Sequence, residues 1–149
     1  GRALALPFLM PLSLWLGGIR KGETMYGQLV HQEQDHNGVT YSLFIEPEDS
    51  PLEGNVIESG DNVTDLLAEV DIAQRLNYGD EWAWFCARVE ASFKSLRGID
   101  MLGCCSYSGK DEFLADDGYW PDMKAQALAN LIMAARDGVE LMEVIGKKG

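Results

Sequence analysis

The sequence has few of the residues that enzymes most often use as nucleophiles, bases and metal ligands. Its 149 residues include two histidines and three cysteines. It contains no G-x-S-x-G nucleophile elbow, no H-E-x-x-H zinc motif and no glycine-rich motif for phosphate or dinucleotide binding. These absences exclude the enzyme classes that such motifs define. We therefore assign no catalytic, cofactor-binding or metal-binding residue from the sequence.

The cysteines give no sign of a disulfide framework or of a zinc site. Cys86, Cys104 and Cys105 are odd in number, and two adjacent cysteines can bridge each other only through a strained ring. The C-x-x-C spacing of zinc ligands is missing. Free thiols are typical of a reducing compartment, so we expect the protein to be cytoplasmic.

Long apolar runs are missing as well. The longest, residues 3–16, contains Pro7 and Pro11 and is shorter than the roughly 20 residues that a membrane helix needs. We expect no membrane contact and a division into an apolar N-terminal segment, residues 1–24, and a single domain, residues 25–149. The segment either lies against a second copy of the chain or is a non-native extension before a start at Met25.

The sequence also has few basic residues relative to acidic ones. The chain has 24 acidic residues against 12 basic ones, a net charge of −12. Acidic residues are densest between Glu46 and Glu81, where Arg75 is the one base. A surface of this sign attracts basic proteins or cations and repels phosphates, so we expect a basic protein as partner and no direct nucleic-acid binding. The candidate interaction residues in this stretch are Glu58, Asp61, Asp65, Glu69 and Asp71.

The first half of the domain predicts a hairpin and then a helix. Residues 25–34 and 39–46 are strand-like, and Asn37-Gly38 between them is typical of a tight hairpin turn. After an acidic connector, Asp61 or Asn62 is expected to begin a helix that Gly79 ends. The helix is expected to bury an apolar stripe and to expose Asp65, Glu69 and Asp71. The predicted stripe is Val63, Leu66, Leu67, Val70 and Ala73.

The second half repeats this order. Residues 81–95 alternate as a strand with the odd positions in the core, and residues 99–107 are its expected hairpin partner after a turn at Arg97-Gly98. A helix is predicted from Pro121 to Gly138, followed by a further helical turn or an edge strand. The fold class is therefore α+β, with a ββα-ββα order and an antiparallel sheet that carries its helices on one face.

Two tryptophans at the start of the second strand unit are candidate partner contacts. Trp82 and Trp84 share the face of the strand that is aromatic at one end and polar at the other. Exposed aromatic side chains are favoured anchors of protein interfaces. We therefore add Trp82 and Trp84 to the candidate interaction residues.

A resemblance covers residues 78–131. The segments YGDEWAWFCARVEASF and GIDMLGCCSYSGKDEFLADDGYWPDMKAQALANL resemble small uncharacterised proteins of bacteriophages and prophages, which carry similar G-D-E-W-A-W, L-G-C-C-S-Y and D-G-Y-x-x-D-M segments. The resemblance implies a phage or prophage setting and, for localisation, the cytoplasm of a host bacterial cell. It implies no activity and assigns no role to any residue.

Three interpretations of the function follow. The first is an acidic accessory protein that acts by protein–protein interaction and mimics nucleic acid to inhibit a basic host protein. The second is a self-associating structural module, a homo-oligomer that buries the apolar N-terminal segment and exposed aromatic residues. The third is a divalent-metal-dependent enzyme that uses the carboxylates between Asp111 and Asp122.

Overall fold

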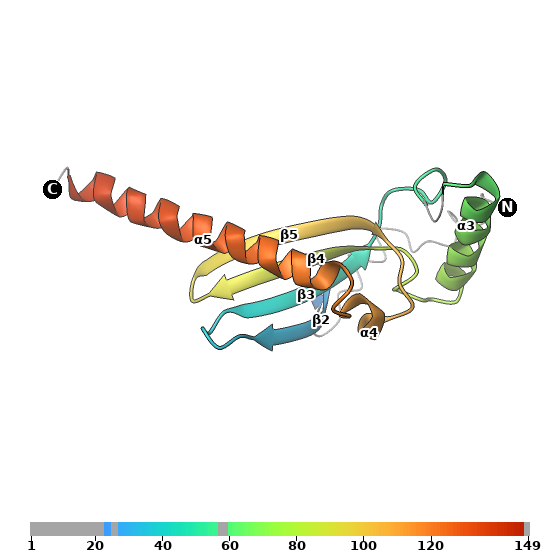
Figure 1. Ribbon diagram of the computed structural model, residues 1–149, viewed down its shortest axis with the longest axis horizontal. Coiled ribbons are helices and arrows are strands. Elements are labelled where there is room, and N and C mark those ends of the chain that lie inside the picture. The colour runs from blue at the N-terminus through green and yellow to red at the C-terminus, as the bar shows by residue number, and fades with distance from the viewer. Residues whose placement is uncertain (1–22, 25–26, 57–59, 148–149) are drawn as a thin grey trace.

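The structure is a computed structural model that describes residues 23–24, 27–56 and 60–147 (Figure 1). Nearly all of the apolar N-terminal segment, and Glu58, lie outside the described residues. The elements follow one another in the order β1 (Glu23–Thr24), β2 (Gly27–Gln34), β3 (Thr40–Pro47), α3 (Asn62–Asn77), β4 (Phe85–Phe93), β5 (Leu96–Cys105), α4 (Lys110–Phe113) and α5 (Tyr119–Gly146).

The strands form an antiparallel sheet in the order β1-β2-β3-β4-β5, so each strand pairs with its neighbours in the sequence. The α+β class is confirmed. The ββα-ββα order is wrong, because the short strand β1 precedes β2 and the short helix α4 lies between β5 and α5. The two-residue strand β1 is too short to produce a periodic pattern in the sequence. The sequence does predict a short helical piece near residues 111–115, and α4 forms there.

One of the two hairpin turns forms where the sequence places it. Gly38 has a φ of 86°, and the Asp35 carboxylate accepts hydrogen bonds from the backbone N–H groups of Asn37 and Val39, at 2.8 and 3.0 Å. The chain therefore reverses at the predicted place, but the loop spans residues 35–39 and is longer than the expected tight turn at Asn37-Gly38. The second turn was placed wrongly: the chain reverses at Lys94, which has a φ of 55°, and Gly98 pairs with Ala91 inside the β4–β5 ladder.

The main core lies between the sheet and α5. The odd-numbered residues of β4 from Phe85 to Ala91 are buried, as their alternation predicts, whereas Phe93 at the end of the strand is 39% exposed, contrary to expectation. The first half of α5 contributes a stripe at helical spacing against them. The core residues of these elements are Tyr41, Leu43, Ile45, Phe85, Ala87, Val89, Ala91, Trp120, Met123, Ala127 and Leu131.

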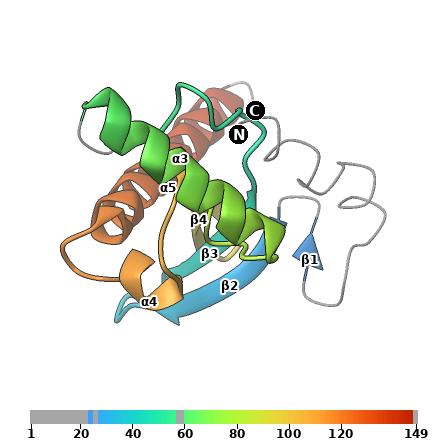
Figure 2. The ribbon, with the colours of Figure 1, turned by 90° about the vertical axis from the view of Figure 1, so that its right-hand side faces the viewer.

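The two long helices do not share one face of the sheet, contrary to expectation. α5 packs on β4 and β5, whereas α3 lies beyond the ends of the strands (Figures 1 and 2). There α3 helps to form a second, smaller core. Its buried residues are Leu52, Val56, Ile72, Ala83 and Trp84. Because the connector after β3 supplies Leu52 and Val56, it holds α3 at this end of the molecule.

Helix α5 does not end at Gly138 as predicted, and of the two alternatives for the residues that follow, the further helix is confirmed and the edge strand is wrong. Gly138 lies inside it, and the helix reaches Gly146. A glycine costs a helix about 1 kcal/mol relative to alanine, a penalty that the good helix formers on both sides offset. Past Leu131 no residue of α5 is buried, and this half of the helix projects from the sheet (Figure 1).

α5 lies so close to β5 that one position between them must be glycine. A Cβ on Gly98 would overlap the backbone oxygen of Ala127 and the backbone nitrogen of Leu131, and would lie 2.8 Å from the carbonyl carbon of Asn130. The Asn130 side-chain amide also donates a hydrogen bond of 2.9 Å to the Ile99 carbonyl. Backbone atoms cannot move aside as flexible side chains can, so this contact fixes the position of α5 on β5.

Gly98→Ala should therefore lower the free energy of unfolding by roughly 1–3 kcal/mol, the usual cost of overpacking. Chemical denaturation followed by circular dichroism measures this change. Gly109→Ala is the matched control, because a Cβ there has no atom within 4 Å and the backbone is extended. Equal stability of the two variants would contradict the close contact.

Candidate functional site

Helix α3 presents to solvent the residues that its sequence pattern placed in the core. Val63, Leu66, Leu67 and Val70 are 65, 41, 65 and 51% exposed. We call these four residues the α3 surface. The face that packs on the small core instead carries Ile72, with Ala68, Ala73 and Leu76 partly buried. The predicted orientation of the helix is therefore wrong for every stripe residue except Ala73.

The acidic residues of this region do not form one exposed face. Glu69, expected on the surface, is 8% exposed and accepts a hydrogen bond of 3.2 Å from the backbone N–H of Gly54 in the connector. Asp65 is half-buried, and Asp71 is exposed. Glu69 therefore joins α3 to the connector, and the expected array of carboxylates is interrupted.

Asp61 begins α3, as the sequence predicts. Its carboxylate accepts hydrogen bonds from the Thr64 hydroxyl, at 2.9 Å, and from the Thr64 backbone N–H, at 3.2 Å. These bonds lower the pKa of Asp61 below its ordinary value. Gly79, with a φ of 82°, follows the last turn of the helix, as expected.

The two candidate tryptophans are packing residues. Trp84 is 3% exposed, and its indole N–H donates a hydrogen bond of 2.9 Å to the Ser50 carbonyl. This burial corrects the expectation that Trp84 is an exposed anchor. Trp82 is partly buried, and its ring stacks edge-on against Phe85, with centroids 5.1 Å apart. The alternating pattern of the strand does not show whether the side chains of Trp82 and Trp84 are buried or exposed.

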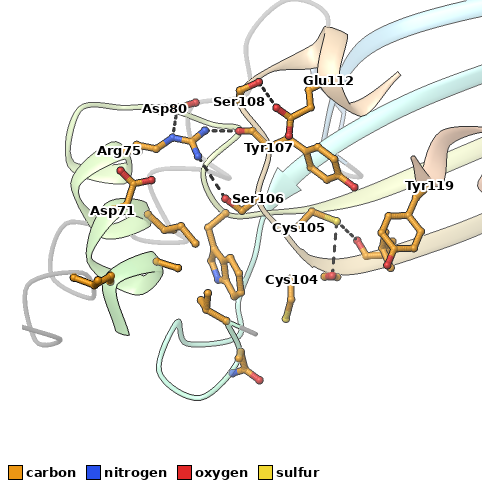
Figure 3. Close-up of a pocket in the computed structure, with 18 of the residues that line it drawn as sticks. Asp71, Arg75, Asp80, Cys104, Cys105, Ser106, Tyr107, Ser108, Glu112 and Tyr119 are labelled. Carbon is orange, nitrogen blue, oxygen red and sulfur yellow. Dashed lines mark hydrogen bonds and ion pairs between the residues drawn. The ribbon is translucent and has the colours of Figure 1, made fainter. Parts of the chain in front are cut away.

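A groove of about 1000 Å³ lies beside the α3 surface, between α3 and the segment that joins β5 to α4 (Figure 3). Asp71 and Arg75 lie on the α3 wall, and residues 104–108 form the opposite wall. Leu67 belongs both to the α3 surface and to the groove lining. The surface and the groove are therefore continuous.

Arg75 ties the two walls together. Its Nε donates to Asp80 Oδ2 at 2.8 Å, and its terminal nitrogens donate to the Tyr107 carbonyl and, at 3.5 Å, to the Ser106 hydroxyl (Figure 3). The guanidinium charge is thus matched by Asp80, whereas Asp71 and Glu112 also line the groove. The lining is acidic overall, which suits a basic ligand.

Cys104 occupies an irregular point of the groove wall. The β4–β5 register shifts here, Cys104 has a φ of 55°, and its backbone N–H donates to Glu48 Oε2 at 3.1 Å. Its side chain is exposed. Cys86 and Cys105 lie deeper, and burial raises their pKa values to about 11 and about 12.

The potential metal ligands in the part of the chain that is described lie apart from one another. No set of three or more His, Cys, Asp or Glu side chains is placed to hold a metal ion there. The carboxylates of Asp111, Asp116 and Asp117 are exposed. The ring of His31 stands edge-on to Trp120, and its Nε2 lies 3.0 Å from Glu33 Oε1, away from the groove.

Over the same residues, none of the helices combines the length and the apolar character required to cross a bilayer. Comparison of the chain with family models, with curated proteins and with solved structures finds no significant match. Any function must therefore be argued from the surface itself.

The thiols should react in a fixed order. Cys104 should be alkylated first by iodoacetamide at pH 8, because it is exposed, whereas Cys86 is partly buried, Cys105 is buried, and both have raised pKa values. Peptide mass spectrometry after timed labelling measures the order. Cys104→Ser should abolish the fast phase, and simultaneous labelling of all three thiols in the folded protein would contradict the burial.

The same two thiols set a pH dependence of stability. In the unfolded chain they ionise near pH 8.5, whereas in the fold they stay protonated to about pH 11 and 12. The unfolded state therefore releases protons first, and the free energy of unfolding should fall as the pH rises above about 9. The double replacement of Cys86 and Cys105 by alanine should flatten this dependence.

Proposed function

We propose that this protein acts by protein–protein interaction and binds a basic partner segment through the α3 surface and the adjoining groove. The observation that carries the proposal is the exposure of four aliphatic side chains on one helix. A contiguous apolar patch with a polar rim is the usual mark of an interaction site. Here the rim is acidic, with Asp61, Asp65 and Asp71 around the patch.

The chemistry of the partner follows from this pattern. The aliphatic side chains of the α3 surface suit apolar side chains of a partner, and the carboxylates around them suit lysine or arginine. An amphipathic helix with a basic flank meets both requirements. With a net charge of −12, the protein would also attract such a partner from a distance.

A narrower form of the proposal is that the protein mimics nucleic acid and inhibits a basic host protein, as a phage accessory factor would. The acidic stretch supports it, because a rigid acidic helix can present a charge density comparable to that of DNA. The aliphatic α3 surface and the inward-facing Glu69 favour the broader form, since a purely electrostatic mimic needs neither.

The test is capture of host proteins from nuclease-treated bacterial lysate with three baits: the wild type, Leu67→Ser and Met101→Ser. Leu67 and Met101 are 65% and 54% exposed, so neither substitution should alter stability by more than about 0.5 kcal/mol. We expect a basic protein that the wild type and Met101→Ser retain and that Leu67→Ser loses. Burying a leucine contributes about 1.5–3 kcal/mol, which corresponds to roughly a 10–100-fold loss of affinity.

Salt and competitor DNA separate the two forms of the proposal. A contact with apolar and acidic parts should weaken with rising salt but persist in part, whereas a nucleic-acid mimic should be released by salt and displaced by added DNA. If Leu67→Ser and Met101→Ser retain the same proteins as the wild type, the α3 surface is not the binding site.

A further inference from the structure

The projecting half of α5 carries a second apolar surface, independent of the α3 surface. Along this helix, apolar residues recur at alternating steps of four and three, the spacing of a coiled-coil seam. We call these residues the α5 seam: Leu128, Ile132, Ala135, Val139 and Met142. Ile132, Val139 and Met142 are 43, 58 and 72% exposed. The seam therefore begins at the sheet and runs out into solvent.

The polar residues beside the seam exclude a membrane surface as its natural cover. They are Arg136, Glu140 and Glu143, which are exposed and together carry a net negative charge. Helices that lie on membranes carry lysine and arginine on the polar face, because the lipid surface is anionic. A protein surface is the better match.

Two opposite charges on one flank of the seam point to a specific partner. Arg136 and Glu143 are seven residues apart, so they lie on the same flank, both directly after a seam residue. The other flank carries Leu131, Gly138 and Ile145, which are uncharged. In an antiparallel pair of identical helices, equal flanks face each other. Each Arg136 would then lie opposite Glu143 of the partner subunit.

We propose that the projecting half of α5 pairs with the same segment of a second copy, in antiparallel orientation about a two-fold axis. A parallel pair would set Arg136 and Glu143 against the uncharged flank and would gain no ion pair. The antiparallel pair gains two symmetric ones. β-branched Ile132 and Val139 alternate with Ala135 and Met142 along the seam, a mixture that packs well between two helices.

The placement of α5 in the fold supports the same orientation. The helix projects past the sheet, so antiparallel pairing leaves the two sheets at opposite ends of the shared helices (Figure 1). The bodies, each with a net charge of −12, are then separated by more than the roughly 8 Å over which charge is felt at physiological salt. The shared stretch, residues 132–146, is about four turns long, so we expect a dissociation constant in the micromolar range.

The dimer would leave the α3 surface free. α3 and the C-terminal end of α5 lie at opposite ends of the molecule (Figure 1). Two α3 surfaces would then point outwards from one assembly. Such an arrangement can bind two sites of one partner at once and raise the apparent affinity without a new contact.

Sedimentation equilibrium of the full chain over a range of micromolar concentrations tests the proposal. The wild type should pass from one chain mass to twice that mass.

The variants test the seam and the orientation separately. Met142→Lys should remain monomeric, because it places a charge in the seam. Arg136→Glu and Glu143→Arg should each weaken dimerisation at least tenfold, since each sets like charges opposite one another. The double variant Arg136→Glu with Glu143→Arg should restore the wild-type constant, because the pairs are exchanged.

Asp137→Lys is the matched control: it reverses a charge on the side of the helix away from the seam and should leave the dimer unchanged. Circular dichroism shows whether each variant is folded. A wild type that is monomeric at every concentration overturns the proposal. So does a dimer that Met142→Lys leaves intact, because another surface then forms it. Failure of the double variant to restore the dimer overturns the antiparallel orientation.

Discussion

The close backbone contact between β5 and α5 at Gly98 is the constraint on which the rest of the structure depends. The missing Cβ lets the helix lie directly on the strand, which brings Ala127 and Leu131 into the core. Because the contact falls near the middle of a long helix, it determines which half of α5 covers the sheet. The half before Leu131 is buried there, and the half after it has no described strand to cover it.

The second determinant is the division of the apolar residues into two cores. The larger lies under α5, and the smaller joins α3 to the connector through Trp84, whose indole is held by the Ser50 carbonyl. A small core can cover only one narrow face of a helix. The remaining aliphatic side chains of α3 stay in water, although burying each would contribute about 1.5–3 kcal/mol. That unrealised free energy favours association with another protein.

The molecule thus combines two exposed apolar surfaces with a strongly negative charge. Apolar surfaces on a neutral protein would promote unspecific aggregation, whereas a net charge of −12 opposes it by repulsion between copies. The charge also makes both surfaces selective. In the complexes that we propose, the acidic rim at α3 would favour a basic partner, and on α5 the opposite charges of Arg136 and Glu143 would favour one orientation of a second copy.

Most local features were correctly predicted from the sequence, although the turn expected at Arg97-Gly98 forms three residues earlier, at Lys94. The turn at Asn37-Gly38, the cap at Asp61 and the buried alternation of β4 depend on a few adjacent residues and on backbone geometry, so neighbouring residues suffice to determine them. The orientation of α3 and the length of α5 were not correctly predicted. Periodicity shows that α3 has an apolar and an acidic side, but only the position of the connector and of Trp84 decides which side is covered. Three further features were also not predictable from the sequence: the burial of Glu69, the continuation of α5 through Gly138 and the groove beside Arg75. They depend on contacts between residues that are distant in the chain, and only the tertiary structure brings those residues together.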